Sequence, residues 1–151
     1  MVTQSHRIFF DTSVYIAALL SPQGSSGELV RLAEAGAIRI VVSERVVVEA
    51  DRVLARRFPD LIEGSHRLWR SISPEIAPAP SSRLLPAFSE KLQPGDASLL
   101  CSAQMVKVSA FVTWNTRDFM KPGVANLVSF PIVIPGECLK LFRKWIEPLL
   151  D

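Results

Sequence analysis

The sequence predicts an α/β fold in which helices flank a central parallel β-sheet. Short apolar runs, each ended by a polar residue, recur along the chain, and longer stretches with helical periodicity lie between them. Unbroken apolar runs of this length are typical of strands buried on both faces, as in parallel sheets. The alternation of strand and helix indicates crossover connections, and function in such sheets lies at the carboxyl ends of the strands.

The expected strands lie at residues 8–10, 38–42, 110–114 and, more weakly, 127–134. Pro131 and Pro135 should confine part of the last strand to a sheet edge, because proline cannot donate to the strand ladder. The Pro- and Ser-rich segment 73–86 is expected to be a surface connection, in which residues 75–77 could add a further strand.

The expected helices lie at residues 14–20, 27–35, 44–58, 59–72, 96–107 and 136–146. Ser25 and Glu28 have the spacing of a capping box, so they are expected to begin the second helix, which should end at Gly36. Ser43 is expected to cap the third helix.

Composition limits the class of protein. A chain of 151 residues with 48% hydrophobic residues suits one domain spanning residues 1–151. The net charge of +2 is too small to identify a nucleic-acid binder by itself. Cys101 and Cys138 lack metal or redox spacing, so we expect core thiols in a reducing cytoplasm. The apolar runs are short and the N-terminus is polar, so we expect a soluble cytoplasmic protein with no membrane segment.

Four acidic residues stand at the ends or on the inner faces of apolar segments. They are Asp11, Glu49, Asp96 and Asp118. Carboxylates in such places either cap helices or converge on a bound cation. Two of them follow strands, one lies on the helix after the second strand and one begins a helix, so in a right-handed parallel sheet all four can face one cleft.

The first two acids also have structural interpretations. Asp11 can cap the helix that follows it, unless Ser13 takes that place and leaves Asp11 available to a ligand. Glu49 is expected to point to the inward side of its helix, and the alternative is an intrahelical pair with Arg45 or Arg52.

The other two acids are open to similar alternatives. Asp96 is expected to face inward from the first turn of its helix, or to act as a plain cap. Asp118 follows the strand at 110–114, where Asn115 also offers an oxygen atom; the alternative is a turn residue or a surface pair with Arg117.

A cluster of ionised carboxylates needs a neutralising cation, because like charges a few ångströms apart raise one another's pKa. Magnesium or manganese would supply it, and such sites suit phosphodiester hydrolysis. Other chemistries lack their motifs. The chain has neither a P-loop nor a G-x-G-x-x-G dinucleotide motif, and Asp11 lacks the second aspartate of a phosphoaspartate enzyme. His6 and His66 lack a metal-binding spacing.

Four segments, in order, resemble the acidic motifs of PIN-domain ribonucleases. They are FFDTSV at 9–14, VSERVVVE at 42–49, PGDASLL at 94–100 and VTWNTRDF at 112–119. The resemblance spans about residues 7–142 and is closest to prokaryotic PIN proteins of the toxin–antitoxin kind, including the VapC-type toxins. It implies a three-layer α/β/α PIN-like fold, cleavage of single-stranded RNA, homodimers and, often, a small antitoxin protein as partner.

The resemblance also implies roles for individual residues. Asp11, Glu49, Asp96 and Asp118 would build a site for Mg²⁺ or Mn²⁺. By matching position, Ser13 would orient Asp11 or a metal-bound water, and Asn115 would sit beside the fourth acid. Many relatives have an aspartate closer to the place of Asn115, so Asp118 and Asn115 are alternatives for completing the site.

Two functions follow from these patterns. The first is a metal-dependent endoribonuclease, and the second is a non-catalytic PIN-like module that binds RNA or a protein. Arginines and lysines near the acids are candidates for phosphate contacts: Arg45, Arg52, Arg56, Arg57, Arg67, Arg70, Lys91 and Arg117. Trp114 could stack on a base, or serve core or dimer packing instead.

Overall fold

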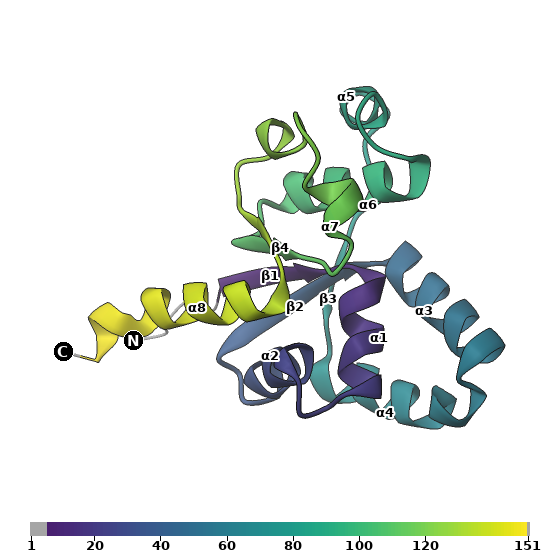
Figure 1. Ribbon diagram of the computed structural model, residues 1–151, viewed down its shortest axis with the longest axis vertical. Coiled ribbons are helices and arrows are strands. Elements are labelled where there is room, and N and C mark those ends of the chain that lie inside the picture. Colours follow the sequence, from purple (N-terminus) through teal and green to yellow (C-terminus); the bar gives the residue numbers. More distant parts are fainter. Residues whose placement is uncertain (1–5, 151) are drawn as a thin grey trace.

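A parallel β-sheet runs through the middle of the molecule with helices on both faces (Figure 1). The computed structural model describes residues 6–150. Within them the sheet has five strands: β1 (His6–Phe10), β2 (Ile38–Ser43), β3 (Glu75–Ala77), β4 (Ala110–Val112) and β5 (Ile132–Val133). Their order is β3-β2-β1-β4-β5, and every neighbouring pair is parallel. The predicted α/β fold with a central parallel sheet is therefore confirmed.

The helices form the two outer layers. They are α1 (Thr12–Leu20), α2 (Ser25–Glu34), α3 (Glu44–Arg57), α4 (Ile62–Ile72), α5 (Leu85–Ser89), α6 (Pro94–Val106), α7 (Thr116–Phe119) and α8 (Pro135–Ile146), with short 3₁₀ turns η1 (Pro59–Leu61), η2 (Ala125–Leu127) and η3 (Glu147–Leu149). In Figure 1 helices α1 to α4 lie below the sheet, α5 to α7 lie above it, and α8 runs out to the side. No helix in residues 6–150 is long and apolar enough to span a membrane.

Aromatic contacts join α7 to the sheet in one helical layer and α1 to α4 in the other. Phe9 on β1 stacks on Phe111 of β4 with a centroid separation of 5.2 Å, and Phe111 meets Phe119 of α7 at 4.9 Å. In the other layer, Tyr15 of α1 stacks on Trp69 of α4 at 3.7 Å. These contacts hold the helices that follow β1 and β4 in fixed positions at the carboxyl edge of the sheet.

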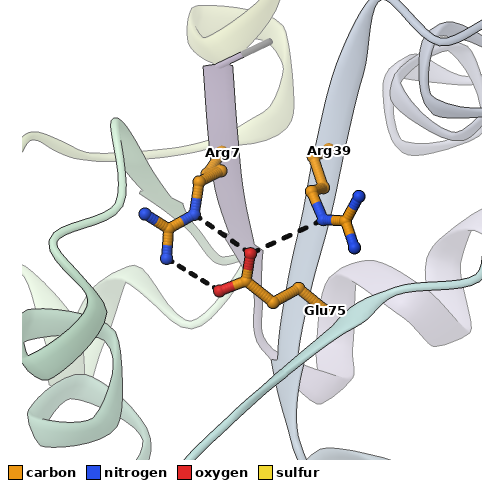
Figure 2. A network of polar contacts seen from close by, with 3 residues as sticks. All are labelled: Arg7, Arg39 and Glu75. Atoms are coloured by element: carbon orange, nitrogen blue, oxygen red, sulfur yellow. Dashed lines mark hydrogen bonds and ion pairs between the residues drawn. The ribbon is translucent and has the colours of Figure 1, made fainter. Parts of the chain in front are cut away.

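A single carboxylate ties three neighbouring strands together (Figure 2). Glu75 on β3 accepts hydrogen bonds from Nε and Nη2 of Arg7 on β1, at 3.2 and 2.7 Å, and lies 3.5 Å from Nε of Arg39 on β2. Arg7 and Arg39 are register partners, so their side chains share one face of the sheet. The tie holds the edge strand β3 and thereby positions the segment that follows it.

One helix start differs from the predictions, and a second has the predicted N-cap residue without its side-chain hydrogen bond. The N-cap of α2 is Gly24, so Ser25 is already helical and the predicted capping box is wrong. Ser43 is the N-cap of α3, but its hydroxyl is buried and finds no partner among the described residues. Gly36, with φ of +80°, follows the end of α2 as predicted.

The expected strands at 110–114 and 127–134 are longer than the observed ones. β4 ends at Val112; the Thr113 N–H still donates to the Val133 carbonyl oxygen at 3.0 Å, whereas the Trp114 N–H donates to the Ser13 hydroxyl instead of a neighbouring strand. β5 has two residues and lies at the sheet edge, as its flanking prolines predicted. The short helices α5 and α7 were not predicted, because segments of four or five residues carry too little periodicity.

Candidate active site

Asp11, the residue that follows β1, is buried and caps helix α1. Its Oδ1 accepts hydrogen bonds from the backbone N–H groups of Ser13 (2.7 Å) and Val14 (3.3 Å) and from the Ser13 hydroxyl. The capping interpretation is therefore correct for Asp11, and Ser13 is not the cap. Capping uses Oδ1 alone: within residues 6–150, Oδ2 accepts only from the Thr113 hydroxyl, so lone-pair capacity remains on that oxygen.

Thr113 and Ser13 join the loop after β4 to this carboxylate. The Thr113 hydroxyl donates to Asp11 Oδ2 and accepts from the Asn115 N–H at 2.8 Å. The Ser13 hydroxyl donates to Asp11 Oδ1 and accepts from the Trp114 N–H at 3.1 Å. Sequence reasoning did not select Thr113 as a site residue. The available signal was its place as the first polar residue after the buried strand β4.

Burial raises the pKa of Asp11 above its ordinary value. The hydrogen bonds from Ser13, Thr113 and Val14 favour the ionised form and oppose this rise, but they do not cancel it. A nearby cation would favour ionisation further, so the chemistry of this carboxylate suits a positively charged ligand.

Asn115 and Asp118 are not independent alternatives in space. Asn115 is the N-cap of α7: its Oδ1 accepts from the Asp118 N–H at 3.4 Å, and its Nδ2 donates to Asp118 Oδ2 at 3.0 Å. Both ends of the amide therefore contact Asp118. Asp118 also lies 3.9 Å from Nε of Arg117, but that guanidinium is 92% exposed and screened by water.

Asp96 is the third residue of α6, a half-buried position in the first turn. The N-cap of this helix is Gln93, so the interpretation of Asp96 as a plain cap is wrong. Burial raises the pKa of Asp96, and the charges of Asp118, Asp11 and Glu49 raise it further, in that order. Lys121 lowers the pKa and offsets these effects only in part. Asp96 is therefore within electrostatic range of the other three acids.

Glu49 is exposed on α3, so the prediction that it points inward is wrong. The buried stripe of α3 consists of Val46, Ala50 and Leu54, and Glu49 stands about 100° from its centre at 3.6 residues per turn. The proposed intrahelical pair with an arginine is not formed within residues 6–150 either. Glu49 instead lines the groove beside α3.

This groove has a volume of about 1010 Å³ and lies between α3, the segment 76–80 at the end of β3 and just beyond it, and the start of α6. Its three acidic lining residues are Glu44, Glu49 and Asp96, and its arginines are Arg45, Arg52 and Arg56 of α3. The opposite wall is apolar and includes Ile76, which is 54% exposed. The α3 wall therefore carries the three arginines together with Glu44 and Glu49, the wall opposite is apolar, and Asp96 lies at the start of α6.

The sequence matches the PIN domain family model over residues 7–117, which is most of the chain. This chain belongs to the PIN-domain family. PIN domains are generally nucleases, and they generally use divalent metals. No curated protein matches the chain in sequence.

Solved structures share the fold of this PIN domain at low sequence identity. One is a chain from the crystal structure of VapBC2 from Rickettsia felis bound to a DNA fragment from the VapBC2 promoter. It aligns with a TM-score of 0.61 and 14% identity, over 84% of this chain and 98% of that chain. PAE2754 from Pyrobaculum aerophilum aligns with a TM-score of 0.60 and 16% identity over 91% of this chain and 98% of that one. The predicted PIN family and its α/β/α fold are confirmed.

The donor set of this PIN domain fits a hard divalent cation, since it consists of carboxylate oxygens. Among the described residues, however, no three His, Cys, Asp or Glu side chains lie close enough to hold one ion as they stand. The four acids interact electrostatically at longer range. Asp11 is fixed by its hydrogen bonds, whereas Glu49, Asp96 and Asp118 are partly or fully exposed, so those three would have to turn toward it to share an ion.

Proposed function

We propose that this PIN domain is a metal-dependent endoribonuclease that hydrolyses phosphodiester bonds of single-stranded RNA with Mg²⁺ or Mn²⁺. The observation that carries the proposal is the electrostatic convergence of four acids at the carboxyl edge of the sheet, where the pKa of Asp96 is raised by burial and by the charges of Asp118, Asp11 and Glu49. Mutually repelling carboxylates in one place are stabilised by a divalent cation.

Each acid has a distinct part in this proposal. Asp11, through Oδ2, and Asp96 would hold the ion, and Glu49 and Asp118 would complete its shell. A divalent cation in such a site supplies water activation and charge stabilisation at the phosphate. Ser13 and Thr113 act as positioning residues for Asp11, because both hydroxyls donate to its carboxylate. Asn115 does the same for Asp118, and this contact supports Asp118 as the fourth acid of the proposed site.

Three arginines of α3 suit the RNA backbone. Arg45, Arg52 and Arg56 fall at i, i+7 and i+11, so they share one side of the helix over roughly 16 Å at 1.5 Å per residue. All three are exposed, and none forms an ion pair within the described region. They can therefore neutralise successive phosphates, while the apolar segment 76–80 faces unpaired bases.

The cellular role we propose is the toxin component of a toxin–antitoxin pair, acting in the cytoplasm as a homodimer and held in check by a small antitoxin protein. The fold shared with the chain of VapBC2 supports this extension. We further propose that the whole chain is one PIN domain, since helices on both faces pack on the same sheet.

A nuclease assay tests the proposal. The purified protein is incubated with structured and unstructured RNA in Mg²⁺, in Mn²⁺ and in EDTA, beside the variants Asp11→Asn and Asp96→Asn. We expect cleavage of unstructured RNA that EDTA stops and that both variants lose while remaining folded. Asp60→Asn, an exposed acid on η1, is the matched control and should cleave normally. Full activity in both site variants would exclude this function.

A second candidate is a non-catalytic PIN-like module that binds RNA or a protein. It is favoured by the one observation that no three metal-binding side chains in residues 6–150 are close enough to hold an ion as they stand. A protein that binds RNA equally well in Mg²⁺ and in EDTA, and never cuts it, would select this alternative.

A further inference from the structure

Trp114 is an exposed tryptophan that is held at two points. Its side chain is 44% exposed, so the interpretation as core packing is wrong. The indole Nε1 donates to the Ser26 hydroxyl at 3.0 Å, and the backbone N–H donates to the Ser13 hydroxyl at 3.1 Å. Ser26 is itself buried, 3% exposed, in the first turn of α2. The ring is therefore fixed in orientation while part of its surface faces solvent.

The other two tryptophans differ from Trp114 in this respect. Trp69 stacks on Tyr15 at 3.7 Å, and Trp145 stacks on His6 at 4.2 Å. Within residues 6–150 Trp114 has no such ring partner. Its exposed aromatic face is thus available to a flat ligand, and its anchoring through the N–H group leaves both ring faces outside the hydrogen bond.

The place of Trp114 in the fold relates it to the acids. It follows Thr113, whose hydroxyl donates to Asp11, and it precedes Asn115, which contacts Asp118. The strand order puts the α3 groove on the β2 and β3 side of β1, whereas Trp114 leaves β4 on the other side. Asp11, which follows β1, therefore lies between the arginine groove and Trp114, while Glu49 and Asp96 line the groove itself.

We propose that Trp114 is a base-stacking platform for the nucleotide on the far side of the cleaved bond from the arginine groove. The inference rests on the proposed function, because the ligand is the RNA of that same site. A fixed aromatic face stacks on any unpaired base, so the contact selects single strands without reading their sequence. Ser26 is a positioning residue, since its hydroxyl holds the indole through Nε1.

The test combines protein variants with modified RNA. A short unstructured RNA that the protein cleaves in Mg²⁺ is prepared with one nucleotide at a time, near the cut, replaced by an abasic residue. At one position the abasic change should raise KM of the unmodified protein about 5- to 150-fold. Trp114→Ala should raise KM on intact RNA by the same factor, with a smaller change in kcat, and should no longer respond to the abasic residue.

Three further variants separate stacking from general damage. Trp114→Phe keeps an aromatic face and should retain most of the affinity, and Ser26→Ala should give a smaller rise in KM than Trp114→Ala. Leu149→Ala, a truncation of a 64% exposed side chain on η3, should leave KM unchanged. In EDTA, where RNA is not cut, RNA should quench a component of tryptophan fluorescence that Trp114→Phe removes. This measurement uses only the unmodified protein and Trp114→Phe, so it tests stacking even if Trp114→Ala does not fold.

The outcomes distinguish the stacking proposal from the nuclease proposal. If the unmodified protein cleaves RNA but Trp114→Ala has the same KM as Leu149→Ala, the stacking proposal is overturned and the nuclease proposal stands. Stacking is also overturned if, at every position, the abasic nucleotide raises KM of Trp114→Ala by the same factor as it raises KM of the unmodified protein. It is overturned as well if RNA quenches the tryptophan fluorescence of Trp114→Phe as strongly as that of the unmodified protein. A folded protein that neither cuts nor binds RNA under any of these conditions overturns the nuclease proposal, and stacking with it.

Discussion

Thr113 donates a hydrogen bond to Asp11 across the centre of the sheet and so connects residues 102 positions apart in the chain. The two residues directly follow β4 and β1, which are paired in the sheet. This bond fixes the direction of the one carboxylate that is buried at the carboxyl edge. It also leaves Thr113 able to accept from Asn115, so one hydroxyl organises both sides of the candidate site.

Replacing Thr113 should therefore affect both stability and activity. In Thr113→Val the buried oxygen of Asp11 and the Asn115 N–H lose their partner, which should lower the free energy of unfolding by about 1–3 kcal/mol. Cleavage should fall at least about tenfold, because Oδ2 of Asp11 loses the hydrogen bond that orients it, although Oδ1 keeps its bonds to Ser13 and Val14. Urea unfolding and initial cleavage rates measure the two effects.

The matched control for this change is Thr12→Val. The Thr12 hydroxyl is also buried and adjacent to Asp11, but it has no hydrogen-bond partner in the described part of the chain. Its loss should be neutral or stabilising, since an unsatisfied buried hydroxyl is unfavourable. Equal destabilisation by Thr12→Val and Thr113→Val would show that the Asp11 contact is not the cause.

Without metal, stability should depend on pH through Asp96. Its pKa in the folded protein is raised above the ordinary value of 3.8. The folded state therefore binds this proton more tightly than the unfolded state does. The stabilisation is fully present below 3.8 and is lost as pH rises through the folded pKa. Unfolding in EDTA, followed from pH 4 upward, should show a decline that Asp96→Asn reduces. Asp60→Asn should keep the full decline, and an unchanged slope in Asp96→Asn would contradict the pKa shift.

Metal binding should restore the stability that is lost when Asp96 ionises. At neutral pH, Mn²⁺ or Mg²⁺ should raise Tm of the unmodified protein, by the equivalent of about 2.7 kcal/mol when the ion is at a hundred times its Kd. The increase should vanish in Asp96→Asn, where the ion loses a ligand and the repulsion is already relieved. Thermal unfolding with and without metal measures it. An equal increase in both proteins would place the ion somewhere else.

Much of the sheet and two of the acids could be predicted because their signals are local. Asp11 ends an apolar run, and Asp96 lies in the first turn of a helix, so their positions follow from neighbours in sequence. The direction of Glu49 was predicted wrongly because its spacing from Val46 was taken as inward, whereas the full stripe of Val46, Ala50 and Leu54 leaves it about 100° from the centre. Trp114 depends on Ser26, 88 residues away, and that contact exists only once α2 has packed near β4. The relation of Asn115 to Asp118 depends on the four-residue helix α7.

The arginines of α3 should contribute to RNA binding according to their place on the groove. Arg52→Gln should raise KM and reduce the slope of log KM against log salt by about 0.7, the value for one phosphate contact with a single strand. Arg57→Gln is the matched control, because Arg57 lies on the same helix but over the Phe58 ring at 5.5 Å and outside the groove lining. Kinetics between low and high salt measure the slopes. Identical slopes in both variants would mean that the phosphates do not follow α3.

The carboxylate of Glu75 should couple edge-strand stability to the groove (Figure 2). Glu75→Gln removes the ion pairs with Arg7 and Arg39, and the cost should be about 1 kcal/mol or less, because these side chains are 29%, 35% and 57% exposed. The segment 76–80, which begins within β3 next to Glu75, forms the apolar wall of the groove, so KM should rise while kcat stays near its original value. Unfolding of Glu75→Gln, Arg7→Gln and the double variant gives the coupling energy between the two residues.

Glu63→Gln is the control for this prediction. Glu63 is an exposed acid on α4, so its replacement should change neither the free energy of unfolding nor KM. A loss of stability without any change in KM would separate the strand tie from the groove wall.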